Sequence, residues 1–337
     1  MDFIEKNRKI CLFSKVYSLR KYLIGIDLGG TNLKAGIVDR NGKILHQFSI
    51  KTDANAESQV ISRQICELVA EIIKKGRIGQ ADIVGIGLGS PGLIDKKGET
   101  ILFSPNLPKW HDVPIKKVIG EKFDLPCILE NDANAAAWGE KWVGAGKNAN
   151  SLVMLTLGTG IGGGIIIDNK LWRGMNNVAA EIGHMTIQAD GPRCNCGNYG
   201  CIEVYASATG MVRRFKELLE SGKASSLKKN DEITAKRISE AAVQGDKTAL
   251  SIIEETGRYL GIAMVNIIHI LNPEVIVLAG GMIGSGELLM NPIKQIIEKR
   301  ALKASYKDTK ILFSQLGTDA GIIGAAGCLL KELEISA

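Results

Sequence analysis

The sequence predicts an α/β protein made of two similar halves, each built around a mixed β-sheet. A strand, a glycine-rich turn and a second strand occur twice, and the interval is 129 residues from Asp27 to Thr156 and again from Asp39 to Asp168. In both halves short apolar strands then alternate with helical patterns. At 337 residues the chain also exceeds one ordinary core, so two domains are expected.

In the first half, a three-strand meander is predicted over 22–28, 33–38 and 44–50. An amphipathic helix over 57–75 follows, because its apolar residues recur at helical spacing. The other elements expected here are a buried strand over 82–88, a strand over 127–129 and an alanine-rich helix over 132–142.

The second half repeats the order of the first. Strands over 152–157 and 165–167 precede a loop region to about 205 and a helical block over 207–271, interrupted around 221–232 and at Gly245-Asp246. The last expected elements are a strand over 274–279, a helix to about 303, a strand over 310–315 and a closing helix over 321–333.

Composition excludes several classes of protein. Hydrophobic residues make up 45% and charged residues 23%, as in a globular enzyme, and no apolar run reaches the roughly 20 residues of a membrane span. The net charge of +6 is concentrated in a basic extension, residues 1–21, which leaves +2 for the remainder and argues against nucleic-acid binding. This extension is an ordered or frayed terminus, an upstream start-codon artefact or a weak partner-binding helix.

The extension lacks a signal-peptide core, so a cytoplasmic location without membrane contact is expected. The cysteines agree with this location. They are odd in number, seven, and Cys11, Cys66, Cys127 and Cys328 are scattered singly, unlike a disulfide framework.

The two glycine-rich turns are candidate phosphate sites, because glycines let several backbone N–H groups point in one direction. Residues 158–163 match G-x-G-x-x-G, but a strand follows where a dinucleotide-binding fold needs a helix. No Walker-type P-loop is present, since no Gly-Lys pair is followed by Ser or Thr. Two turns, one per lobe, that grip one polyphosphate across a cleft are therefore expected, as in a phosphotransferase.

Three segments, 27–32, 157–164 and 271–281, resemble the phosphate-1, phosphate-2 and adenosine segments of the actin-like sugar kinases. The chain is most similar to the ROK family (repressors, open reading frames and kinases), specifically its bacterial glucokinases, from Tyr22 to the last helix. This resemblance implies the duplicated actin-like (ribonuclease H-like) fold, with an N-terminal lobe over 22–135 and a C-terminal lobe over 136–337. The last helix is expected to pack back on the N-terminal lobe.

The resemblance also implies that ATP with Mg²⁺ is bound between the two hairpins. Asp27 either faces the magnesium–nucleotide region or hydrogen-bonds the Gly30–Thr31 turn. The residues expected to bind the nucleotide are Asp27, Gly29, Gly30, Thr31, Asn32, Gly158, Thr159, Gly160, Gly162, Gly163, Gly280 and Gly281.

Asp132 is the candidate general base. In Glu130-Asn131-Asp132-Ala133-Asn134 a buried strand gives way to a helix, so Asp132 is either a helix N-cap or the carboxylate that takes a proton from an acceptor hydroxyl. The segment resembles the family's catalytic segment, which implies the second role. The resemblance further implies a sugar pocket that contains Gly92, Asn106, Asn131, Asp132, Glu181, His184 and Glu203.

His184, Cys194, Cys196 and Cys201 have the spacing H-x9-C-x-C-x4-C, which predicts a closed tetrahedral site for one structural Zn²⁺. Buried free thiols are the alternative, since a Cys194–Cys196 disulfide is geometrically poor. The same motif resembles the family's zinc loop. The second ring nitrogen of His184 would then be able to contact the sugar.

The predicted function is ATP-dependent phosphorylation of glucose at its 6-hydroxyl. N-acetylmannosamine, N-acetylglucosamine or fructose are alternative acceptors, and polyphosphate is an alternative donor. A sugar-sensing repressor is the alternative from another class, but 21 residues before Tyr22 are too few for its helix-turn-helix domain. A homodimer or homotetramer is expected.

Overall fold

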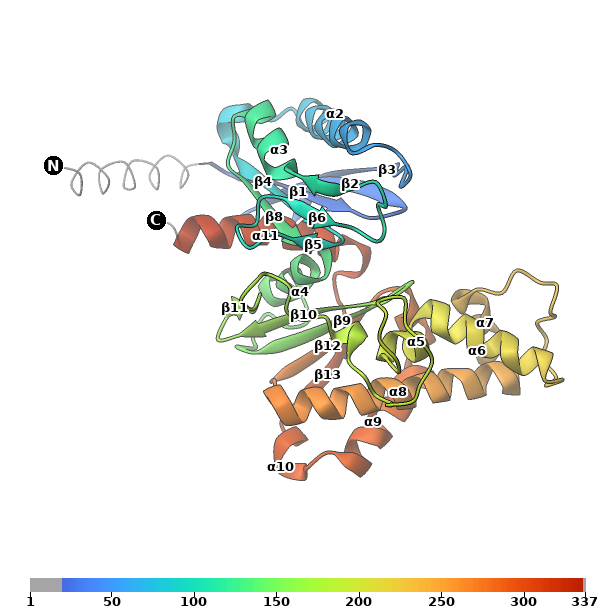
Figure 1. Ribbon diagram of the computed structural model, residues 1–337. Helices are drawn as coiled ribbons and strands as arrows, with labels where there is room; N and C mark the ends of the chain where they lie inside the picture. Colours follow the sequence, from blue (N-terminus) through green and yellow to red (C-terminus); the bar gives the residue numbers. More distant parts are fainter. Residues whose placement is uncertain (1–19, 336–337) are drawn as a thin grey trace. The chain divides into compact units, whose positions relative to one another are not determined.

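The computed structural model describes residues 20–335 and divides into two compact units (Figure 1). The first unit comprises residues up to Asn148, Leu171–Ala179 and the chain from Thr318, and the second comprises Ala149–Lys170 and Ala180–Gly317. The predicted basic extension lies outside the described residues, except for Arg20 and Lys21. Of the helices within residues 20–335, none has the length and apolar character needed to cross a bilayer.

The first unit is built on a five-stranded sheet of order β3-β2-β1-β4-β8. Strands β1 to β3 are an antiparallel meander, while β4 and β8 continue the sheet parallel to β1. Its elements are β1 (Tyr22–Leu28), β2 (Asn32–Asp39), β3 (Ile44–Lys51), α2 (Ser58–Gly76), a 3₁₀ turn (Gln80–Asp82), β4 (Ile83–Ser90), β5 (Leu93–Ile94), β6 (Ile101–Phe103), β7 (His111–Val113), α3 (Ile115–Phe123), β8 (Cys127–Asn131), α4 (Asp132–Trp142), a 3₁₀ turn (Gly317–Asp319) and α11 (Ala320–Ile335).

The second unit repeats this topology in a sheet of order β11-β10-β9-β12-β13. Here β9 and β10 are the antiparallel hairpin, and β12 and β13 run parallel to β9. Its elements are β9 (Leu152–Leu157), β10 (Ile161–Ile167), β11 (Lys170–Leu171), a 3₁₀ turn (Ile182–His184), α5 (Ile202–Ala206), α6 (Ala208–Glu220), α7 (Ala235–Val243), α8 (Lys247–Leu271), β12 (Val275–Ala279), a 3₁₀ turn (Gly281–Ser285), α9 (Glu287–Arg300), α10 (Lys303–Tyr306) and β13 (Lys310–Phe313).

The equivalent strand orders confirm the duplicated α/β fold with mixed sheets. Each sheet has its own hydrophobic core. One core packs α2 and α3 on the first sheet through residues such as Ile65 and Ile119, and the other packs α8 and α9 on the second through residues such as Leu260 and Ile293.

Helix α11 lies against β1 and β4 in the first unit. The approach is so close that a Cβ atom on Gly87 would meet the carbonyl oxygen of Ala325 at 1.9 Å, so only glycine fits at this point of β4. Helix α11 also packs on α4. The predicted boundary between residues 135 and 136 therefore falls inside α4, and the chain to Asn148 is grouped with the first unit.

Several elements differ from the predictions. The loops after Ser90 contain a small three-stranded sheet, β5-β6-β7, and α3 follows it. Strand β10 begins at Ile161, four residues earlier than predicted, because the glycines there pair with β9. The helix predicted to about 303 is α9, which ends at Arg300, and the short helix α10 that follows was not predicted. Helix α5 occupies part of the predicted loop region.

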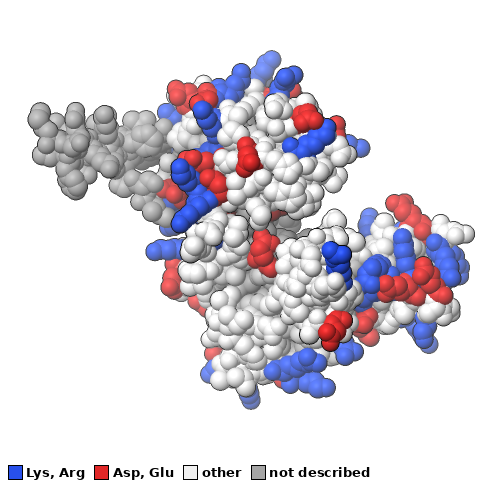
Figure 2. Space-filling view, viewed as in Figure 1, with Lys and Arg blue, Asp and Glu red and all other residues white. Residues whose placement is uncertain are grey.

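Charges of both signs are mixed on one face of the molecule. On the face shown in Figure 2, basic and acidic side chains of the described residues alternate, and no large field of one sign is visible. This face therefore shows no basic stripe of the kind that binding to a nucleic-acid backbone requires.

Candidate active site

The candidate site in the first unit lies where three parallel strands end. Asp27 of β1 is paired with Gly89 of β4, and Ser90 of β4 is paired with Asn131 of β8. The first glycine turn follows β1 directly and is closed by a 2.9 Å hydrogen bond from the Gly29 N–H to the Asn32 carbonyl oxygen. The structure thus brings Asp27, the turn and the Asn131–Asp132 segment to one edge of the sheet, where ligands of open α/β sheets bind.

The Asp27 carboxyl lies against the start of α11, where a Cβ atom on Gly321 would come within 2.6 Å of its Cγ. Within residues 20–335 no hydrogen bond to this carboxyl is found, so the predicted alternative of a bond to the Gly30–Thr31 turn is not observed. Burial raises the pKa of Asp27, and the charge of Lys34 lowers it by less. A half-buried carboxylate that accepts no hydrogen bond from the described residues would be stabilised by a cation, so Asp27 fits the magnesium side of the nucleotide.

Asn131 caps helix α4. Its Oδ1 accepts hydrogen bonds from the N–H groups of Ala133 at 3.0 Å and Asn134 at 3.1 Å. Asp132 is the first residue of the helix, with Oδ1 2.8 Å from the Ala133 nitrogen. The predicted alternative of Asp132 as the N-cap is therefore wrong, because Asn131 has the extended backbone and the two bonds of an N-cap. Asn131 keeps its Nδ2 group to donate to a ligand.

Asn106 lies against the first glycine turn, since a Cβ atom on Gly30 would be 3.2 Å from the Asn106 Cβ. Gly92 packs against the backbone of Phe103 and Ser104, which directly precede this loop. It has a φ of 106°, and a Cβ atom there would lie 2.3 Å from the Phe103 carbonyl oxygen. Gly92 is thus explained by backbone packing, whereas Asn106 is placed beside the turn with a polar side chain.

In the second unit the glycine turn is shorter than the sequence suggests. It spans Gly158–Gly160 and is closed by a 3.0 Å bond from the Gly158 N–H to the Gly160 carbonyl oxygen. Gly162 and Gly163 lie within β10, opposite Thr156 and Leu155 of β9. These two residues are therefore ladder residues and not part of the turn.

The Gly280–Gly281 pair lies next to this turn. Strand β12 runs parallel to β9, and Ala279 is paired with Thr156. Gly280 has a φ of 95°, and a Cβ atom there would lie 2.3 Å from the Leu157 carbonyl oxygen. The predicted phosphate-2 and adenosine segments thus meet at the carboxyl edge of the second sheet.

The four predicted zinc ligands form one cluster, in which the potential ligand atoms lie within 4.8 Å of one another. Cys196 Sγ is 3.8 Å from Cys201 Sγ, and His184 Nδ1 is 3.7 Å from Cys194 Sγ. Zn–S bonds of about 2.3 Å at tetrahedral angles require ligand separations of about 3.7 Å. The residues therefore fit a Zn²⁺ ion with Nδ1 as the histidine donor.

The thiol chemistry of this cluster also favours a cation. Burial and, to a smaller extent, the neighbouring Cys196 and Cys194 thiols together raise the pKa of Cys201 to about 12. The pKa of Cys194 is raised as well, while hydrogen bonds lower that of Cys196, so two of the three thiols resist ionisation until a divalent cation stabilises the thiolates.

Two carboxylates adjoin the cluster. His184 Nε2, on the other side of the ring from Nδ1, lies 4.0 Å from Glu181 Oε2. Burial raises the pKa of Glu181, while the His184 ring lowers it and the Glu203 carboxylate raises it. The structure therefore brings Glu181, His184 and Glu203 together beside the zinc ligands.

One ion pair near Asp132 has no counterpart in the sequence analysis. The Glu130 carboxylate, 6% exposed, accepts a 2.7 Å bond from Arg173 Nε. It also accepts bonds at 3.1 Å from the Asn131 N–H and from Asn134 Nδ2. An acidic residue at the end of a buried strand signals a partner, but Arg173, 43 residues away, has no local signal that identifies it.

Comparisons with known proteins agree with this geometry. The family model that matches residues 23–332 is that of the ROK family. A glucokinase from Halalkalibacterium halodurans is 38% identical over 94% of this chain and 97% of its own. The xylose repressor of Caldicellulosiruptor bescii is 34% identical over 92% of this chain and 78% of its own. A solved ROK family glucokinase from Streptomyces griseus, in complex with glucose and AMPPNP, is 36% identical with a TM-score of 0.77 and covers 92% of this chain and 99% of that one.

Proposed function

The chain belongs to the ROK family and has its duplicated actin-like fold, and from this premise we propose that it transfers the γ-phosphoryl group of ATP to the 6-hydroxyl of glucose. Two kinds of observation support the proposal. Glucokinases are among the relatives that match nearly the whole chain. In each unit a glycine turn also follows one of the parallel strands, and candidate ligand groups lie beside that turn.

Asp132 is the proposed general base. It accepts the proton of the 6-hydroxyl while the sugar oxygen forms a bond to the γ-phosphorus and the bond from phosphorus to the bridging oxygen of ADP breaks. Its place at the first position of α4 keeps the short side chain at the carboxyl edge of the sheet. The N-terminal end of that helix favours the charged carboxylate that this role requires.

The nucleotide is proposed to bind at the glycine turns, with phosphate oxygens accepting from backbone N–H groups at 30–31 and 159–160, and with adenosine beside Gly280–Gly281. Asp27 is the proposed group for Mg²⁺ or its water shell. When bound, Mg²⁺ neutralises charge on the phosphates of ATP. Gly162 and Gly163 lie in the β10 ladder directly after this turn, so the proposed contact of these two glycines with the nucleotide would come from the strand.

The sugar is proposed to contact Asn106, Asn131, Glu181, His184 and Glu203, whose amide, imidazole and carboxylate groups suit a ring of hydroxyls. A Zn²⁺ ion held by His184, Cys194, Cys196 and Cys201 would have no open position, so its proposed role is structural. The predicted homodimer or homotetramer and the cytoplasmic location stay predictions.

The observation that carries the mechanism is the capping of α4 by Asn131. Because Asn131 makes the capping bonds, the structural reason for an aspartate at position 132 is already supplied by its neighbour. The Asp132 carboxylate lies at the helix start, beside Asp27 and the first glycine turn. Its proposed role is therefore to accept a proton from a substrate hydroxyl group.

The test is a coupled ADP-release assay with glucose, mannose, fructose, N-acetylglucosamine and N-acetylmannosamine, using ATP and polyphosphate as donors. Glucose with ATP should give the highest kcat/KM, and glucose-6-phosphate dehydrogenase should oxidise the product. A higher kcat/KM for an N-acetylated hexose would identify that sugar, and not glucose, as the acceptor. No phosphorylation of any hexose by purified, folded protein would overturn the proposed function.

A further inference from the structure

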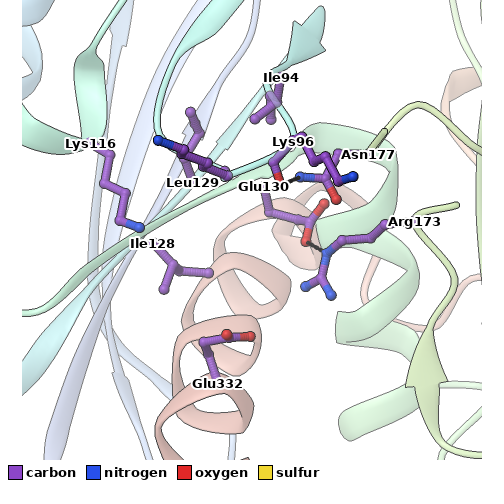
Figure 3. A pocket seen from close by; sticks show the side chains of 11 residues that line it. Ile94, Lys96, Lys116, Ile128, Leu129, Glu130, Arg173, Asn177 and Glu332 are labelled. Carbon is purple, nitrogen blue, oxygen red and sulfur yellow. Dashed lines mark hydrogen bonds and ion pairs between the residues drawn. The ribbon is translucent and has the colours of Figure 1, made fainter. Parts of the chain in front are cut away.

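A pocket of about 210 Å³ lies in the first unit and contains none of the residues predicted to bind sugar or nucleotide (Figure 3). The loop after β5, helix α3, strand β8, the segment Leu171–Ala179 and helix α11 all contribute to its wall. Its volume is below the roughly 300–1,000 Å³ of pockets for drug-sized molecules, so a ligand would have to be small.

Arg173 is held in the wall of this pocket by one edge of its guanidinium group. Its Nε donates to the buried Glu130 carboxylate at 2.7 Å, and Figure 3 shows the two side chains joined there. Glu130 is itself fixed by the Asn131 N–H and by Asn134 Nδ2. Within the described part of the chain the two terminal nitrogens of Arg173 have no hydrogen-bond partner, so a preoriented guanidinium group keeps four N–H donors available.

Three lysines complete the basic lining. Lys96 and Lys97 come from the loop after β5, and Lys116 comes from α3. None of these three ammonium groups has an ion-pair or hydrogen-bond partner among residues 20–335. The pocket has four basic side chains against two acidic ones, Glu130, which is paired with Arg173, and Glu332 on α11, so two positive charges are in excess.

The rest of the lining limits the ligand further. Ile94, Ile128 and Leu129 supply apolar surface, and Asn177 is anchored by bonds from its Nδ2 to the Asp95 and Lys96 carbonyl oxygens. Those bonds tie the segment that carries Arg173 to the loop that carries Lys96 and Lys97. These three basic groups therefore belong to one connected structure, which lowers the cost of ordering them around a ligand.

We propose that this pocket binds a small oxyanion, a phosphate or carboxylate group of a metabolite, through the terminal nitrogens of Arg173 and the ammonium groups of Lys96, Lys97 and Lys116. A guanidinium group with its Nη atoms available pairs with either kind of oxyanion through two parallel hydrogen bonds. The site is separate from the proposed site of phosphoryl transfer, and it does not depend on the glucokinase proposal.

The test measures binding directly, by isothermal titration calorimetry of the full chain with inorganic phosphate and, in a second arm, with citrate. The triple variant Lys96→Met, Lys97→Met, Lys116→Met should weaken binding of the preferred anion at least tenfold. The matched control is Lys216→Met, Lys294→Met, Lys299→Met, which removes the same charge from exposed lysines of the second unit. That control should change the affinity less than threefold.

Arg173→Lys provides a second variant, because it retains a cation for Glu130 but loses the guanidinium fork. It should weaken binding while the thermal unfolding temperature stays near that of the wild type. Equal weakening by the two lysine triples would attribute binding to overall charge and overturn the proposal. Saturable binding that the pocket triple leaves unchanged would place the anion elsewhere, for example at the glycine turns, and would overturn it as well. The phosphate and citrate arms decide between a phosphorylated and a carboxylated ligand, and binding of neither refutes the site.

Discussion

Glu203 accepts a 2.9 Å hydrogen bond from the backbone N–H of Ile161, the first residue of β10. Its other carboxylate oxygen lies 3.8 Å from Cys194 Sγ in the zinc-ligand cluster. Directly before Ile161, a Cβ atom on Gly160 would approach Glu203 Oε2 to 2.4 Å. One carboxylate therefore connects the cysteine cluster to the glycine turn proposed to bind phosphate.

Replacing Glu203 should consequently weaken nucleotide binding as well as sugar binding. Glu203→Ala removes a charged acceptor from the Ile161 N–H, a loss of about 1.5–3 kcal/mol, which corresponds to at least a tenfold rise in the Kd of AMPPNP. Glu203→Gln keeps an oxygen acceptor and should raise that Kd less than the alanine variant does. Fluorescence or calorimetric titration of the nucleotide measures both, and Glu240→Ala, an exposed change on α7, is the control. An unaltered AMPPNP affinity in Glu203→Ala would mean that the hydrogen bond does not shape the turn.

Asp132→Asn should lower kcat for glucose phosphorylation by about 10²–10⁴, the range for loss of a general base. The amide is isosteric, and Asn131 continues to cap α4, so the thermal unfolding temperature should change little. Steady-state kinetics with a coupled assay and a thermal melt check the two expectations.

Asp124→Asn is the matched control for this change. Asp124 ends α3 in a left-handed conformation, φ 48°, which asparagine also tolerates. Its kcat should equal that of the wild type. A folded Asp132→Asn variant with near-normal turnover would remove Asp132 from the mechanism.

The repeated hairpin made the fold predictable, because its spacing set the same order of strands in both units. The breaks in the helical block were also predictable, since α7 and α8 begin at capping residues, Thr234 and Asp246. Helix α3 and the small sheet β5-β6-β7 were missed. They consist of very short strands and a nine-residue helix, whose stability comes from packing on the first core and not from local periodicity.

Sequence reasoning about the site went furthest where residue type and spacing are specific. The spacing of His184 and the three cysteines predicts a metal site, and the structure gathers the four side chains, while the zinc itself stays a prediction. It left the helix cap open at Asn131 and Asp132, because either side chain could cap α4, and the structure places the cap at Asn131. It also assigned Gly162 and Gly163 to the turn, since no local pattern separates a glycine in a turn from one in a ladder.

Metal removal should separate the zinc cluster from the catalytic residues. A strong chelator is expected to release about one zinc per chain, measured by atomic emission, and to raise the KM for glucose more than it changes kcat, because Glu181, His184 and Glu203 adjoin the cluster. Cys196→Ser should reduce the metal content and lower the unfolding temperature.

Cys66→Ser is the control for the cysteine change, because Cys66 lies on α2 in the first unit. Its zinc content should stay at that of the wild type. A preparation that contains no zinc and retains the wild-type KM and unfolding temperature would show that the four residues are ordinary thiols and an imidazole.

The second unit should lose stability in acid, because the stabilising contribution of the Asp246 carboxylate is lost there. Its Oδ1 accepts from the Thr248 and Ala249 N–H groups at the start of α8, and its Oδ2 accepts from Ser225 and Ser226. Burial opposes the charged form, but these hydrogen bonds outweigh it and hold the pKa of Asp246 well below its ordinary value. The charged carboxylate therefore stabilises the fold at pH values above about 4, the unfolded pKa, and this contribution is lost as the pH falls through the lower folded pKa.

Asp246→Asn should lower the free energy of unfolding by about 1–2 kcal/mol at pH 6, because it loses charged acceptors but retains a capping oxygen. Urea unfolding of wild type and variant at pH 6, 5, 4 and 3 measures the difference, which should shrink below pH 4 because the Asp246 carboxyl then takes up a proton in the unfolded chain but not in the fold. Asp308→Asn, at an exposed position before β13, should be neutral throughout. A difference between wild type and Asp246→Asn that is as large at pH 3 as at pH 6 would mean that the charge of Asp246 contributes nothing, and that its hydrogen bonds stabilise α8 equally well from a neutral side chain.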